Sequence, residues 1–291
     1  MQHLLKAGKF LGVEELALKQ SLTRYQAGAA PPQREVTKKE TVFIASAEIN
    51  NYTDYELRWL GIATAQGKDG LVAVVFLRGD MQRYSDYYCN GTEEIARQID
   101  ICNGNPLVNA ILFVVDSGGG EVASTDVLVQ AIKTSEKPII GFGIERVASA
   151  ALECFAHCDE CYIESNMTCL GSIGVMLVLC DQSAHNEQEG LKYMVIRAAG
   201  AEDKAPLNPW ESFDSPAAQA EIEQRQGICN QMRAEMLAKI MKARPQMSAD
   251  PGAKIFYGKD AIKIGLADGI TSFANALKRA DVLGIQYKKG A

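Results

Sequence analysis

The stretch VNAILFVVDSGGG at residues 108–120 decides the fold. Its first nine residues form an almost continuous apolar run of strand length, which is typical of a strand buried on both faces of a sheet. The three glycines that follow permit a sharp turn, because glycine adopts backbone angles that are closed to other residues. Two more apolar runs of this kind lie at 71–77 and 137–143. Together the three runs indicate neighbouring parallel strands.

Segments with helical spacing separate these apolar runs. Strands that alternate with helices predict an α/β protein, with a largely parallel sheet built from repeated ββα-like units and covered on both faces. We expect helices at 93–102, 121–135, 149–158 and 215–243, further strands at 160–165, 174–181 and 192–198, and a smaller helix-and-strand tail at 256–283.

Composition narrows the class of protein. The chain has 291 residues, of which 47% are hydrophobic and 23% charged, as in ordinary folded proteins. Its formal charge of −6 argues against a general nucleic-acid binder. No apolar run approaches the ~18 residues that a membrane helix needs, and the first residues do not resemble a signal peptide. We therefore expect a cytoplasmic protein without a membrane span.

Two other features bear on organisation. The eight cysteines are too sparse for a disulfide framework in a chain of this length, so we interpret most of them as buried thiols in a reducing compartment. Pro31, Pro32 and the charges after them indicate a linker. The expected organisation is an extension and linker at 1–40, a connecting segment at 41–70, a main domain at 71–285 and a tail at 286–291.

The turn DSGGG at 116–120 and the segment RVASAALE at 146–153 carry the candidate chemistry. Main-chain N–H groups of a glycine turn can bind an oxyanion, although a tight structural turn explains the glycines equally well. Ser149 stands where a helix begins. Such a serine is most often a helix N-cap, and the alternative is a nucleophile among small alanines.

A nucleophilic serine needs a base. His157 lies eight residues further along the same expected helix, beyond hydrogen-bond reach, and His185 has the surroundings of a solvated surface residue. Lysine is the other candidate, provided that burial lowers its pKa enough for it to be neutral. Lys204, in the loop AGAEDKAPLNP, is the lysine in a suitable place, although most loop lysines are merely solvated.

A rival site is the triplet Cys154, Cys158 and Cys161, with spacing C-x₃-C-x₂-C. That spacing is compatible with a [4Fe–4S] cluster or a contribution to a zinc site. The neighbouring alanine, leucine and phenylalanine residues favour cysteines buried for packing, and we expect no metal and no cofactor.

The ordered set DSGGG, ASAA at 148–151, GSIGV at 171–175 and a lysine some thirty residues later resembles the signal peptide peptidase A family, in particular its short phage-type members. The tail FYGKDAIKIGLADGI at 256–270 resembles that family's closing segment. The resemblance covers roughly residues 71–280 and implies the Clp protease/crotonase-like fold.

The resemblance also implies roles for particular residues. Ser149 corresponds to the nucleophile and Lys204 to the general base, Gly119 with the amide of Ala150 to the oxyanion hole, and Ser172 to the residue that orients the lysine. The chain departs from the family pattern in having glycine in place of proline in S-P-G-G, alanines after the nucleophile, and one extra residue between Gly200 and the lysine.

The function that this resemblance implies is a serine endopeptidase with a Ser–Lys dyad. A homo-oligomeric ring, a protein or peptide substrate such as a phage portal or capsid precursor, and a location in the bacterial cytoplasm or the phage prohead are implied with it. Three alternatives stay open: a crotonase-type acyl-CoA enzyme, a non-catalytic scaffold protein of a phage head, and the metal or cluster protein described above.

Overall fold

The computed structural model describes residues 11–13, 42–45, 70–86 and 89–290. The chain divides into two compact units. The large unit comprises Gly12–Gly174 and Met236–Ala291, and the small unit comprises Met1–Leu11 and Val175–Glu235. The predicted extension at 1–40 lies outside the described residues except for 11–13, and the expected division into an extension, a connecting segment and a domain from 71 stays a prediction.

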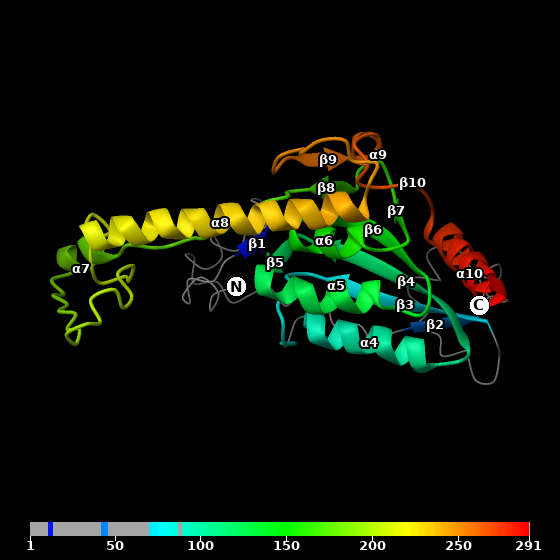
Figure 1. The fold of residues 1–291 in the computed structure, drawn as a ribbon, viewed down its shortest axis with the longest axis horizontal. Helices are drawn as coiled ribbons and strands as arrows, with labels where there is room; N and C mark the ends of the chain where they lie inside the picture. Colours follow the sequence, from blue (N-terminus) through cyan, green and yellow to red (C-terminus); the bar gives the residue numbers. More distant parts are fainter. Residues whose placement is uncertain (1–10, 14–41, 46–69, 87–88, 291) are drawn as a thin grey trace. The chain divides into compact units, whose positions relative to one another are not determined.

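An eight-stranded sheet forms the centre of the large unit (Figure 1). Its main path runs β10-β7-β6-β4-β3-β2, with β8 beside β6 and β9 beside β8. All neighbours are parallel except β2 with β3 and β8 with β9. The predicted α/β class with a largely parallel sheet is thus confirmed. The strands are β2 (Val42–Ala45), β3 (Leu71–Arg78), β4 (Val108–Ser117), β6 (Ile139–Ala148), β7 (Glu160–Ile163), β8 (Cys169–Gly171), β9 (Ile255–Tyr257) and β10 (Gly269–Ile270); β1 (Leu11–Val13) pairs separately with β5 (Gly119–Glu121).

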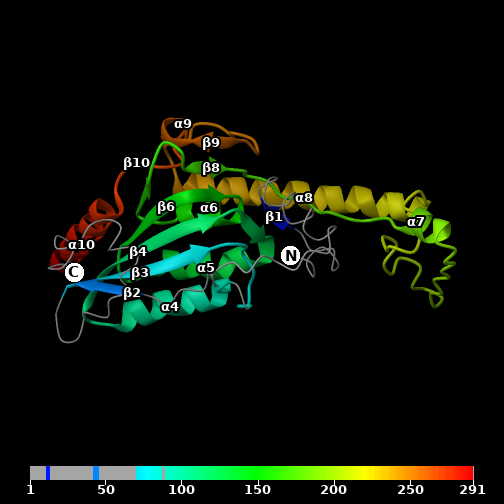
Figure 2. The same ribbon diagram turned by 180° about the vertical axis from the view of Figure 1, so that it is seen from behind.

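Both faces of the sheet are covered by helices (Figures 1 and 2). Alternate residues of β3 and β4, such as Val75 and Phe113, pack with side chains from α4, α5, α6 and the last turns of α8. The intervening residues, such as Val74 and Leu112, pack with α10. This division follows from the two-residue period of a strand, and it explains why the strands read as apolar throughout. The helices are α4 (Thr92–Gly104), the short η2 (Val122–Ser124), α5 (Thr125–Lys133), α6 (Ala150–Ala156), α7 (Ser183–Gln188), α8 (Pro216–Ala243), α9 (Gly258–Lys263) and α10 (Phe273–Gly290).

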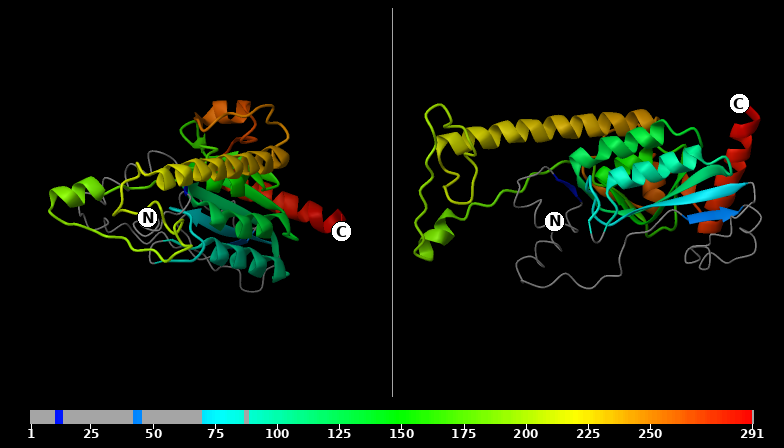
Figure 3. Two further views of the ribbon diagram at one scale, coloured as in Figure 1. Left: turned by 60° about the vertical axis from the view of Figure 1, so that its left-hand side comes forward. Right: turned by 90° about the horizontal axis from the view of Figure 1, so that it is seen from below.

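Most predicted elements of the large unit are confirmed within a few residues at their ends. In the views of Figure 3, α4, α5 and α6 lie on the same side of the sheet, because each crosses between neighbouring parallel strands in the same direction along the sheet. One difference matters for the site: β6 continues to Ala148, five residues beyond its expected end at Gly143. Two smaller differences are an antiparallel strand β2 within the connecting segment 41–70, and the continuation of α10 through residues 286–290.

The two strands predicted at 174–181 and 192–198 are not formed. Their apolar residues suggested burial, but Met194 and Ile196 are 83% and 85% exposed. A strand needs a neighbour to accept its backbone hydrogen bonds, and in the described part of the chain no strand pairs with either segment, although Met176 forms an isolated β-bridge. Residues 175–181 and 192–198 therefore run as largely irregular chain in the small unit, which also contains α7 and the first part of α8.

Candidate active site

Three strand ends meet at one edge of the large unit's sheet. β4 and β6 are aligned so that Ser117 is opposite Val147, and β6 and β8 so that Ala148 is opposite Gly171. The strands are parallel, so the turns that follow them lie at the same edge. Those turns contain Gly119, Ser149 and Ser172, three of the predicted site residues.

Ser149 forms a sharp turn between β6 and α6. Its backbone has φ 55° and ψ −126°, and its side chain makes no capping bond to the helix. The hydroxyl is buried and instead donates a long hydrogen bond of 3.4 Å to the Gly174 carbonyl. The N-cap interpretation of this side chain is therefore wrong, although the Ser149 carbonyl does accept from the N–H groups of Leu152 and Glu153.

The backbone of Ser149 is strained. A non-glycine residue with positive φ is uncommon, and such a conformation costs about 1–3 kcal/mol. The conformation is held by the hydrogen bond from the Ser149 N–H to the Gly171 carbonyl, at 2.9 Å, and by the start of α6. Strain of this kind occurs at sites where a side chain must be presented in one defined position.

The two expected oxyanion donors differ in their bonding. Ala150 is the first residue of α6, so its N–H has no intrahelical partner. The Gly119 N–H donates to the Ser117 hydroxyl at 3.1 Å, and that hydroxyl donates to the Gly79 carbonyl at 2.5 Å. Gly119 has φ 89°, a conformation for which glycine is suited. The Gly119 amide is thus engaged within its own turn in this structure.

Ser172 lies directly after β8 and also has φ 55°. Its N–H donates to the Lys254 carbonyl at 2.9 Å, which fixes the turn to the chain before β9. The preceding Gly171 has φ 133°, and a Cβ there would lie 2.1 Å from the Lys254 oxygen. Close approach of two backbones therefore requires glycine at 171 and places Ser172 beside the Ser149 turn.

Lys204 belongs to the small unit and its side chain is exposed. Its N–H donates to the Ala201 carbonyl at 3.0 Å, and its own carbonyl accepts from Arg197 Nε at 2.8 Å. The residue lines a hollow of about 650 Å³, together with apolar side chains such as Tyr193 and Trp210. Because Ser149 is in the large unit, the pairing of the two residues stays a prediction.

The structure describes two of the three histidines, His157 and His185, and His157 lies away from the Ser149 turn. His157 is at the other end of α6, where its Nδ1 is 2.7 Å from the Glu153 carbonyl oxygen. Burial lowers the pKa of His157. His185 is exposed on α7 of the small unit.

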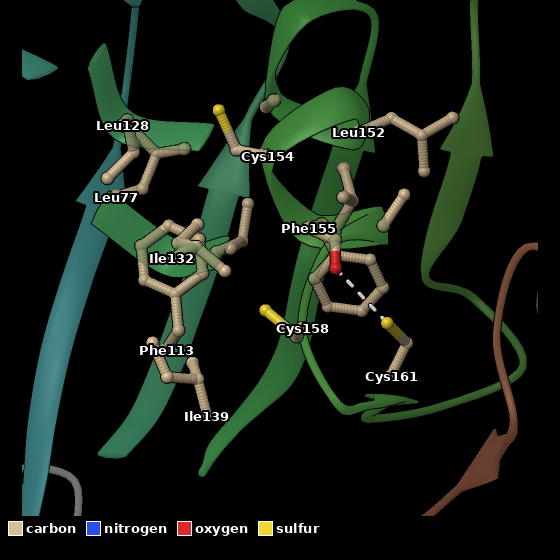
Figure 4. Close-up of a cluster of buried hydrophobic side chains, with 14 of the residues drawn as sticks. Leu77, Phe113, Leu128, Ile132, Ile139, Leu152, Cys154, Phe155, Cys158 and Cys161 are labelled. Carbon is tan, nitrogen blue, oxygen red and sulfur yellow. Dashed lines mark hydrogen bonds between the residues drawn. The ribbon is translucent and has the colours of Figure 1, made fainter. Parts of the chain in front are cut away.

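The three cysteines that are close in sequence belong to the hydrophobic core (Figure 4). Cys154, Cys158 and Cys161 lie apart among side chains such as Leu128, and the Cys161 thiol donates to the Phe155 carbonyl at 3.1 Å. Burial raises the pKa of all three thiols, that of Cys161 to about 12, which disfavours the thiolate that a metal would need. Among the described residues no three histidine, cysteine or acidic side chains are placed to hold a metal ion.

One feature of the site was missed by sequence reasoning. Asp116 precedes the glycine turn, and its carboxylate accepts a hydrogen bond of 3.2 Å from the Arg146 N–H on the neighbouring strand. The aspartate stood within the quoted motif DSGGG, but the partner could not be identified, because β6 was expected to end before Arg146.

Comparison with known proteins places the chain in a family. The model of peptidase family S49 matches residues 131–285, which is more than half of the chain. The chain belongs to peptidase family S49. The matched region contains Ser149, Ser172 and Lys204. This agrees with the resemblance inferred from the motifs.

Individual relatives are more distant. A protein of Methanocaldococcus jannaschii, provisionally named a protease, is 26% identical over 204 residues, covering 68% of this chain and 61% of the relative. The capsid assembly protease C of Escherichia phage lambda is 24% identical over 201 residues, covering 68% of this chain and 44% of the relative. The head-tail preconnector protein GP5 of Enterobacteria phage P21 is 26% identical, covering 58% and 34%. The S49 chain thus spans about a third to three fifths of these proteins.

Among solved structures, a mutant of ClpP1 from Listeria monocytogenes is similar with a TM-score of 0.45 and 17% identity, covering 70% of this chain and 94% of the other. Within the part of the S49 chain that the structure describes, no helix has the length and apolar character needed to cross a membrane.

Proposed function

We propose that this S49 protein is a serine endopeptidase that cleaves peptide bonds through an acyl-enzyme on Ser149. The observation that carries the proposal is the Ser149 turn. A strained serine stands at the meeting point of three strand ends, and its hydroxyl is not used as a helix cap. Membership of a peptidase family supports the same conclusion.

In the proposed mechanism Lys204 is the general base. Its neutral amine takes the proton of the Ser149 hydroxyl while the oxygen forms a bond to the peptide carbonyl carbon. The C–N bond then breaks as the ammonium returns the proton to the leaving amine. Water attacks the ester in the second half, giving a proton to the lysine, and the Ser149 oxygen leaves with that proton. Ser172 is proposed to orient the lysine.

The oxyanion of each tetrahedral intermediate needs N–H donors. The Ala150 amide is one, since it lies at the start of α6 with no helical partner. The Gly119 amide is the second, and it must exchange the Ser117 hydroxyl for the substrate oxygen. Removing one such donor typically lowers the rate ~10²–10³-fold.

A lysine acts as a base near neutral pH when burial lowers its pKa. The Lys204 side chain is exposed in this chain, so the mechanism requires another surface to cover it. We propose that a homo-oligomer, as the family resemblance implies, provides that surface. The phage relatives named a capsid assembly protease and a preconnector protein support a phage portal or capsid precursor as the substrate.

The decisive test is covalent labelling. A fluorophosphonate probe should modify the wild-type protein at Ser149, identified by mass mapping of the labelled peptide. Ser149→Ala should take no label. The control is Ser183→Ala, which removes the hydroxyl of the first residue of α7, a helix without buried residues, and it should be labelled like wild type. Absence of label from the wild-type oligomer would refute the peptidase proposal.

The burial of Ser149 favours one alternative, a non-catalytic protein of the phage head. Such a protein would still assemble with head proteins but would leave them intact. Incubation of the wild-type protein with candidate head precursors, followed by gel analysis, separates the two functions, because a peptidase yields fragments that Ser149→Ala does not.

A further inference from the structure

We infer that Asp116 is a positioning residue, which fixes the glycine turn of the oxyanion hole relative to the turn that carries Ser149. The inference rests on the proposed function and adds to it a residue that none of the assigned roles includes. Its basis is the hydrogen bond from the Arg146 N–H to the Asp116 carboxylate, which links β6 to β4.

The bond lies where the two strands lose their regular alignment. Val115 is opposite Gly143, and the next aligned pair is Ser117 with Val147. β4 thus advances by two residues while β6 advances by four. Such a bulge leaves backbone groups of the longer strand without ladder partners on the neighbouring strand, here β4. The Asp116 carboxylate supplies an acceptor for one of them, the N–H of Arg146.

The hydrogen bond between Asp116 and Arg146 lies at the same distance along the chain from the two site residues that follow it. Gly119 follows Asp116 by three residues, and Ser149 follows Arg146 by three residues. Any slip of β6 against β4 at the bulge would therefore move the oxyanion donor relative to the nucleophile. A displacement of about 1 Å can lower the rate of a reaction ~10²-fold.

Backbone bonds already secure the other side of the glycine turn. The Gly79 N–H donates to the Asp116 carbonyl at 3.0 Å, and the Met81 N–H donates to the Gly119 carbonyl at 2.9 Å. These bonds connect the turn to the end of β3 and the chain after it. Toward β6 the regular ladder is interrupted, so the side chain of Asp116 takes over the connection.

The surroundings of Asp116 fit this role. Burial is the largest influence and raises the pKa of the Asp116 carboxyl, and the charge of Glu145 raises it further. The Arg146 N–H and the guanidinium groups of Arg78 and Arg146 act in the opposite direction. A partly buried carboxylate is costly unless hydrogen-bonded. At the bulge the carboxylate of Asp116 serves as the acceptor for the Arg146 N–H.

The test compares Asp116→Ala with Asp116→Asn in the full-length protein. The asparagine retains an acceptor oxygen and loses the charge. We expect Asp116→Ala to lower the rate of Ser149 labelling by a fluorophosphonate ~10–100-fold, with little change in the probe concentration at half-maximal rate. Asp116→Asn should remain within about threefold of wild type, since a neutral acceptor still satisfies the amide.

Hydrogen exchange at the Arg146 amide gives a readout independent of catalysis. Exchange should accelerate at least ~10-fold in Asp116→Ala and remain near wild type in Asp116→Asn, because the bond protects that amide. Glu145→Ala is the matched control, since it removes the exposed neighbouring carboxylate of the same bulge and should change neither measurement.

The outcomes are distinguishable. Wild-type labelling with equal labelling of Asp116→Ala would overturn the inference while leaving the proposed function intact. An Asp116→Asn variant as slow as Asp116→Ala would also overturn it, because charge and not the acceptor would then matter. No label on the wild type would refute the peptidase proposal, and unchanged Arg146 exchange in Asp116→Ala would then refute the link as well.

Discussion

Ser149 and Ser172 occupy matching positions at the ends of two adjacent parallel strands. Each directly follows one member of the aligned pair Ala148 and Gly171, and each has φ 55°. Positive φ is unfavourable for serine, so the fold maintains two strained serines next to each other at one edge of the sheet. This edge also receives the glycine turn after β4. The coincidence of strain and position is the strongest structural indication of a functional site in the S49 chain.

Ser149→Gly should stabilise the protein. Glycine adopts positive φ readily, so the substitution removes part of the strain, and we expect a gain of about 0.5–1 kcal/mol in the free energy of unfolding. Ser149→Ala keeps the Cβ and should show no such gain. Urea denaturation measures both variants, and an equal effect of glycine and alanine would show that strain at this backbone is not the cause.

Lys204→Ala should abolish peptidase activity while changing the free energy of unfolding by less than about 0.5 kcal/mol, since the side chain is exposed. Labelling of Ser149 and thermal denaturation test the two halves of this prediction. Lys192→Ala, an exposed lysine of the same unit, is the control. Retained turnover in Lys204→Ala would assign the base to another group.

Gly171→Ala should destabilise the protein by about 2 kcal/mol or more. Its Cβ would lie 2.1 Å from the Lys254 oxygen, at a backbone angle that alanine rarely adopts. Gly227→Ala is the matched control, because nothing lies within 4 Å of a Cβ there. Gly227 lies in the helix α8, where alanine is more favourable than glycine, so we expect Gly227→Ala to raise the free energy of unfolding by up to about 1 kcal/mol. Equal Tm values for the two variants would contradict the close approach at Gly171.

The raised pKa of the Glu153 carboxyl predicts that the free energy of unfolding depends on pH. Burial is the largest influence and raises the pKa of its carboxyl above 4.5, against the pull of Lys239, whose Nζ is 3.2 Å from Glu153 Oε1. The folded state therefore holds this proton more tightly than the unfolded state. Its contribution to stability is fully present below the unfolded pKa and is lost as the pH rises through the folded pKa.

Glu153→Gln removes this titration. Relative to wild type, the free energy of unfolding of the variant should increase as the pH rises from about 4 to 8, which means that the variant becomes the more stable of the two. Lys239 retains Asp126 at 2.7 Å, which limits the cost of losing its other partner. A difference that stays constant with pH would show that the carboxyl does not titrate with a raised pKa.

The predicted strands differ in outcome for a physical reason. The runs 71–77, 108–116 and 137–143 each form a strand that is paired with a neighbouring strand on both sides, so their apolar residues are buried. The run 192–198 also contains consecutive apolar residues, at 193–196, yet Ile196 is exposed. Hydrophobic pattern indicates that a segment can enter a sheet, while strand pairing depends on what the rest of the chain places beside it.

The residues of the sequence alone determined the α/β class and the order of strands and helices in the large unit, and they marked the glycine turn and Ser149 as candidates, because buried parallel strands and glycine turns leave local patterns. The particular roles of Gly119 and Ser172 came from the family resemblance. Tertiary structure decided which of these residues meet. The extension of β6 to Ala148, the bulge opposite Asp116 and the strained angle of Ser149 all arise from alignment between strands distant in sequence. Such alignment is set by packing and hydrogen bonding across the whole sheet, and no short stretch of sequence contains it.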